Sequence, residues 1–98
     1  MTHRIEQLYQ FALEDPSDPF NWYALALEYM KTDTGKSIEI FNRILSEHKE
    51  YVPTYYHLGK LYQGEGKNDE ALQTFELGVQ VAGRQKDFKA LRELTAAI

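Results

Sequence analysis

Apolar residues recur along the chain with the period of an α-helix, and the same stripe appears twice. The first stripe is Trp22, Leu25, Ala26 and Tyr29, and the second is Tyr55, Leu58, Gly59 and Tyr62, each 33 residues later. Offsets of 0, 3, 4 and 7 lie on one face of a helix, so each set predicts one buried helical stripe. A further stripe follows each of them. It is Ser37, Phe41 and Ile44 in the first copy and Ala71, Phe75 and Gly78 in the second, and equivalent residues are 34 positions apart. The repeating unit is therefore a pair of helices.

Turn and capping residues divide the chain into six predicted helices. The turns fall at residues 15–19, 32–35, 50–53 and 64–66, and the fifth helix is expected to end near Gly83. Asp18 is a predicted N-cap with Pro19 in the first turn, and Asn68 or Asp69 is the predicted cap of the fifth helix.

The two terminal helices carry apolar stripes of their own. The stripe of the first helix is Ile5, Leu8, Tyr9, Ala12 and Leu13, and that of the last is Phe88, Leu91, Leu94 or Thr95, and Ile98. We expect the first helix to resemble the second half of a repeat. We expect the last to cover the final full repeat.

Gly59 interrupts an apolar stripe in the middle of a predicted helix. Glycine there costs about 1 kcal/mol relative to alanine, so a packing reason is expected. Close approach of the following helix is the predicted reason, with Ala71 as the small residue on that helix and Ala26 and Ser37 as the equivalent pair in the first repeat.

The run Tyr55-x-x-Leu58-Gly59-x-x-Tyr62 followed by Ala71-x-x-x-Phe75 resembles the tetratricopeptide repeat. The resemblance covers about two repeats. It implies an all-α fold, an α-solenoid of antiparallel helix pairs in a right-handed superhelix with about six helices. We expect a single domain over residues 1–98, with an N-terminal half-repeat helix at 1–15, repeats at 19–50 and 52–85, and a C-terminal capping helix at 86–98.

Composition agrees with a small globular domain. The 98 residues carry a net charge of −4 and contain no cysteine, which excludes disulfides and thiolate metal sites. No basic cluster is long enough to follow a phosphate backbone, so nucleic acid is not expected as a ligand. No apolar run approaches the roughly 20 residues that span a membrane, and we expect a cytoplasmic location without a membrane partner.

The sequence carries no recognisable catalytic pattern. It has no glycine-rich phosphate loop and no nucleophile elbow, and Gly64-Glu65-Gly66 is an inter-helix turn. The three histidines stand on different predicted helices without metal-ligand spacing. We therefore expect a protein that is not an enzyme, with no catalytic residue, no metal site and no cofactor.

In the family that the chain resembles, the first helix of each repeat lines a concave surface. The expected partner-binding residues are those outside the packing stripes of these helices, namely Phe20, Tyr23, Leu27, Met30, Tyr56, His57, Lys60 and Gln63. The first four are apolar or aromatic and the second four are mostly polar. Contiguous apolar side chains are rarely left exposed to water, so we expect something to cover them. Three alternatives remain: a partner peptide, a second copy of the chain, or the chain's own terminal helix.

The predicted function is that of a small adaptor that binds a peptide or partner helix in this groove, with Tyr23 and Tyr56 as anchors that have no role in packing the repeat. The alternative is a self-association module that forms a homodimer through the same groove. The clamp of lysines and asparagines with which members of the resembled family hold a peptide carboxylate is not matched, because Tyr23, Leu27 and His57 stand at those places.

Overall fold

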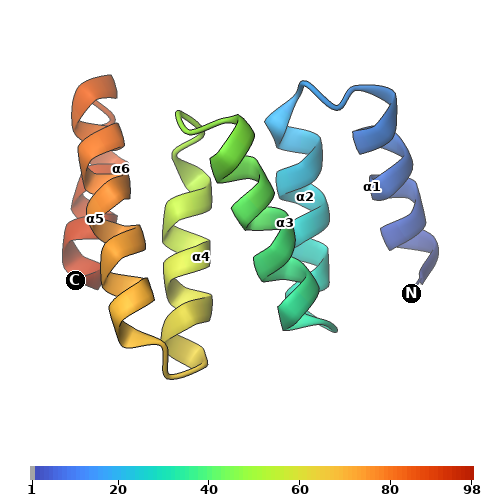
Figure 1. Cartoon of the computed structure of the whole chain (residues 1–98). Helices are drawn as coiled ribbons and strands as arrows, with labels where there is room; N and C mark the ends of the chain where they lie inside the picture. The colour runs from blue at the N-terminus through green and yellow to red at the C-terminus, as the bar shows by residue number, and fades with distance from the viewer. Residues whose placement is uncertain (1) are drawn as a thin grey trace. The chain divides into compact units, whose positions relative to one another are not determined.

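The structure is a computed structural model that describes residues 2–98. This part of the chain forms six α-helices and no strand (Figure 1). The helices are α1 (Thr2–Glu14), α2 (Pro19–Tyr29), α3 (Thr34–Glu47), α4 (Pro53–Gly64), α5 (Asn68–Gln85) and α6 (Phe88–Ala97). They belong to two compact units, of which the first ends at His48 and holds α1 to α3, while the second begins at Lys49 and holds α4 to α6. The six predicted helices are confirmed.

Aspartate side chains cap three of the helices. Asp18 accepts a hydrogen bond from the backbone N–H of Phe20 at 3.0 Å, and Pro19 occupies the first turn of α2, as predicted. Asp33 accepts from the N–H of Lys36 at 3.0 Å, so α3 begins inside the predicted turn. Asp87 accepts from the N–H of Ala90 at 3.1 Å and starts α6.

The N-terminal end of α5 differs from the prediction. Lys67 occupies the N-cap position without a side-chain hydrogen bond, so the expected cap by Asn68 or Asp69 is wrong. Asp69 and Glu70 instead lie in the first turn, where the positive end of the helix dipole favours carboxylates. The helix ends at Gln85, near Gly83 as expected, and its C-cap residue Lys86 has a left-handed φ of 58°.

In the first unit, α2 packs against both α1 and α3. Leu8 and Ala12 of α1 are buried, but Tyr9 and Leu13 are each 48% exposed, so the predicted five-residue stripe of α1 is too wide. A stripe centred on Leu8 and Ala12 leaves these two side chains at the edge of the helix contact. Between α2 and α3 the Ser37 hydroxyl donates to the backbone carbonyl of Ala26 at 2.8 Å, and both residues are fully buried.

In the second unit, α4 and α5 approach each other closely at Gly59. A Cβ atom on this residue would lie 2.6 Å from atoms Cδ1 and Cζ of the buried Phe75 ring. The expected close approach is therefore confirmed, and the group lying directly over the glycine is Phe75 of α5.

Gly78 is the point where α5 meets both other helices of the second unit. A Cβ atom there would lie 2.6 Å from Cβ of Tyr55 on α4 and 3.0 Å from Cδ1 of Leu94 on α6. Leu94 is 1% exposed and is the side chain through which α6 enters the core. Phe88 lies about 120° around the helix from Leu94 and is 60% exposed, so the expectation that it covers the repeat is wrong. Ile98, which follows the last residue of α6, is also exposed.

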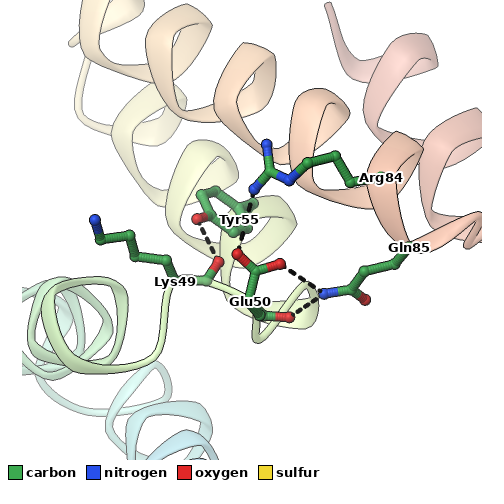
Figure 2. Close-up of polar contacts among 5 residues, drawn as sticks. All are labelled: Lys49, Glu50, Tyr55, Arg84 and Gln85. Atoms are coloured by element: carbon green, nitrogen blue, oxygen red, sulfur yellow. Dashed lines mark hydrogen bonds and ion pairs between the residues drawn. The ribbon is translucent and has the colours of Figure 1, made fainter.

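A polar network ties the segment before α4 to the end of α5 (Figure 2). The side-chain amide of Gln85 donates to the backbone carbonyl of Glu50 at 2.6 Å, and Arg84 pairs with the Glu50 carboxylate at 3.2 Å. The Tyr55 hydroxyl donates to the backbone carbonyl of Lys49 at 2.7 Å. Burial and the nearby Glu50 carboxylate raise the pKa of Tyr55, which keeps this donor protonated.

The absence of a side chain at Gly78 lets α5 pack closely against α4 and α6. Two substitutions in α5 test this role. We expect Gly78→Ala to overpack the contact with Tyr55 and Leu94 and to lower the free energy of unfolding by about 1 to 3 kcal/mol. The matched control is Gly83→Ala, because nothing lies within 4 Å of a Cβ at this position. Its expected effect is a gain of up to about 1 kcal/mol from helix propensity. Urea unfolding of both variants measures the difference, and equal effects would contradict the packing role of Gly78.

Candidate functional site

In the first unit, the candidate residues follow one side of α2 outside its buried stripe. Phe20 lies in the first turn of the helix and is 57% exposed. Tyr23, Leu27 and Met30 come at spacings of three or four residues and are each half-buried. The structure thus places these four side chains along the same helix surface, with an exposed aromatic ring at its N-terminal end.

Tyr23 and Tyr56 take part in packing their own helix pairs. The Tyr23 ring lies 6.1 Å from the ring of Phe41 on α3, and the Tyr56 ring lies 6.4 Å from that of Phe75 on α5. The expectation that these tyrosines have no packing role is therefore wrong. The sequence holds a signal for this contact, since the tyrosines are 33 residues apart and the phenylalanines 34, as are the other members of their stripes. Both tyrosines are half-buried in these contacts.

In the second unit, the candidate residues lie on α4. The Tyr56 and His57 rings meet edge to face with centroids 5.7 Å apart. The Lys60 ammonium lies 5.9 Å from the centre of the Tyr56 ring, within the range of a cation–π contact. Lys60 and Gln63 are exposed, while Tyr56 and His57 are half-buried. This surface offers a cation beside an aromatic ring.

The ionisation of His57 is coupled to the packing of the second unit. Burial lowers the pKa of His57, and the negative charge of Glu93 on α6 partly opposes this shift. The imidazole is therefore predominantly neutral at pH 7. A neutral ring beside Tyr56 gives the α4 surface polar groups without a second positive charge.

The chemistry that these surfaces offer is that of recognition. Within residues 2–98 there is no group of three or more histidine, cysteine, aspartate or glutamate residues placed to hold a metal ion. Over the same residues no helix has both the length and the apolar character needed to cross a membrane. Exposed aromatic side chains, as on α2, and a cation beside an aromatic ring, as on α4, are both typical of surfaces that bind a polypeptide.

The lowered pKa of His57 predicts a pH dependence of stability. Because its pKa is lower in the folded chain than in the unfolded chain, the unfolded state takes up more protons as the pH falls below about 6.5, and stability decreases. We expect the free energy of unfolding to fall between pH 7.5 and 5.5 by more in the wild type than in His57→Gln. Urea unfolding at both pH values measures the difference. An identical decrease in His57→Gln would show that the ring does not titrate as described, and His48→Gln is the control for a general effect of histidine removal.

Comparison with solved structures identifies the fold and the family. The chain is 42% identical to a tetratricopeptide repeat domain protein from Salinibacter ruber, whose solution NMR structure it matches with a TM-score of 0.80 over 85% of each chain. It matches a crystal structure of the tetratricopeptide repeat domain protein from the same organism at 41% identity and a TM-score of 0.78, over 82% of this chain and 90% of that one.

A more distant similarity supports the same fold. MamA matches at 25% identity and a TM-score of 0.67, over 94% of this chain and 61% of MamA. No family model and no curated protein matches the chain.

The fold is one that generally serves as a non-catalytic module for protein–protein interaction. Six helices in the order of the repeat, the two helical stripes and the likeness to the Salinibacter ruber proteins together show that the chain belongs to the tetratricopeptide repeat family.

Proposed function

We propose that the chain is an adaptor that binds a peptide or helix of a partner protein. The binding residues in this proposal are those outside the packing stripes of α2 and α4: Phe20, Tyr23, Leu27, Met30, Tyr56, His57, Lys60 and Gln63. The observation that carries this proposal is the 57% exposure of Phe20. Phe20 lies at the end of a row of half-buried apolar side chains. Burial of these side chains by a ligand would supply a favourable free energy of binding.

The polar residues on α4 indicate how a ligand is oriented. Lys60 is exposed and lies near the Tyr56 ring, so a ligand carboxylate that approaches this ring meets a positive charge. A partner segment with an apolar anchor suits the α2 surface, and one with an acidic residue suits the α4 surface. Self-association is the alternative, since a second copy of the chain would also remove Phe20 from water.

Two phenylalanines of similar exposure provide the test. Phe20 is 57% exposed on α2 and Phe88 is 60% exposed on α6, so Phe20→Ala and Phe88→Ala remove the same group from different surfaces with little effect on the core. We expect a peptide selected against the wild-type protein from a displayed library to bind Phe20→Ala roughly tenfold or more weakly, which is typical of an aromatic anchor. Phe88→Ala should bind with unchanged affinity. Fluorescence anisotropy with the labelled peptide measures both.

The same variants separate a foreign partner from a second copy. Light scattering over a concentration series should show a monomer if the partner is another protein. A wild-type dimer that Phe20→Ala converts to a monomer would instead support self-association through this surface. Equal peptide affinity and equal mass in both variants would contradict the assignment of α2 as a binding surface.

A further inference from the structure

The first unit contains a cavity on a different side of α2 from the surface proposed above. It has a volume of about 330 Å³ and is bounded by side chains of α1, α2 and α3. Trp22, Leu25 and Tyr29 of α2 line it, whereas Tyr23, Leu27 and Met30 do not. The position of Tyr23 is about 100° around the helix from Trp22, so the two surfaces of α2 are distinct.

Tyr9 of α1 forms a wall of this cavity. Its ring meets the Trp22 ring edge to face at 6.4 Å, and 48% of the residue is exposed. The core contacts of α1 are made by Leu8 and Ala12, so Tyr9 adds aromatic surface to the cavity beyond what the helix contact needs. Aromatic side chains that remain partly exposed beside a cavity are the usual lining of a ligand site.

Arg43 of α3 also lines the cavity and supplies an oriented positive charge. The centre of its guanidinium lies 4.1 Å from the centre of the Trp22 ring, and its Nε lies 3.5 Å from the Glu47 carboxylate. Stacking on a buried ring and pairing through Nε restrict the rotation of the side chain, which lowers the entropy lost when its terminal N–H groups bind an anion. Lys36 and Glu39 also line the cavity and pair with each other at 3.5 Å, so their charges offset and Arg43 is the cation that the proposal uses.

These features together define the chemistry of a ligand. The aromatic and aliphatic lining favours an apolar side chain, and the volume is sufficient for one such group. The Arg43 fork favours a carboxylate, because planar guanidinium and carboxylate groups pair through two hydrogen bonds. We propose that the cavity is a second peptide-binding site, which takes an apolar side chain from a partner segment that carries a carboxylate beside it.

Three small probes separate the parts of this proposal. N-acetyl-leucine carries both the apolar group and the carboxylate, N-acetyl-leucinamide lacks the carboxylate, and acetate lacks the apolar group. Trp22 is the only tryptophan in the chain, so its indole N–H gives a single, identifiable signal in a ¹H–¹⁵N NMR spectrum. We expect N-acetyl-leucine to shift this signal and the amide signals of Tyr9 and Tyr29 saturably. The amide should bind about fivefold or more weakly, and acetate should leave the signals unchanged.

A pair of variants tests the role of Arg43. Arg43→Gln keeps most of the stem over Trp22 but removes the charge, and we expect about fivefold or greater loss of affinity for N-acetyl-leucine. Arg92→Gln, which removes an exposed arginine of α6, is the matched control and should leave this affinity unchanged. N-acetyl-leucine titrations of both variants, followed at the Trp22 indole signal, give the two affinities.

Four results would overturn the proposal. The first is the absence of saturable shifts at Trp22, and the second is equal affinity for N-acetyl-leucine and its amide. The third is unchanged affinity in Arg43→Gln. The fourth is a shift of the Trp22 signal with protein concentration alone, which would show that a second copy of the chain occupies the cavity. Phe20→Ala should retain the N-acetyl-leucine site, so failure of the α2 surface proposed above is distinguishable from failure of this site.

Discussion

The contact between the two helices of each repeat is the constraint on which the other features depend. In the second unit it consists of the Phe75 ring lying over the backbone of Gly59, with no room for a side chain at that position. In the first unit Ala26 occupies the place of Gly59, and the Ser37 hydroxyl bonds to its carbonyl at 2.8 Å. Small residues at these points let two helices approach closely, and the large residues around them fill the remaining space.

A hydrogen bond from the buried stripe holds the segment that precedes the first helix of each repeat. The Trp22 indole N–H donates to the backbone carbonyl of Pro16 at 3.1 Å, and the Tyr55 hydroxyl donates to that of Lys49 at 2.7 Å. Both acceptors lie six residues before their donors, so the repeat conserves a polar tether as well as an apolar stripe between its two copies. Outside the packing stripes of these two helices, Phe20 of α2 and Lys60 and Gln63 of α4 are exposed.

The repeated stripes and the helix pairs could be predicted from the sequence because a period of 3.6 residues and a recurrence at 33 or 34 are visible in it. Periodicity does not give the width of a buried stripe. Tyr9 and Phe88 therefore appeared to belong to the core, although the tertiary contacts of α1 and α6 centre on Leu8 and Leu94. The cavity beside Trp22 could not be predicted either, because side chains from three different helices line it. The packing of Tyr23 and Tyr56 on phenylalanines has a signal in the sequence, because the tyrosines and the phenylalanines recur with the spacing of the repeat, but only the structure shows that the rings meet.

A double-mutant cycle on Gly59 and Phe75 tests the central constraint most directly. The free energy of unfolding is measured for the wild type, Gly59→Ala, Phe75→Leu and the double variant. Helix propensity at position 59 cancels in the cycle, which leaves the interaction between the two positions. If the glycine is required by the ring, Gly59→Ala should be less destabilising in the Phe75→Leu background, with a coupling free energy of about 1 kcal/mol or more. Effects that add to within about 0.5 kcal/mol would contradict the account.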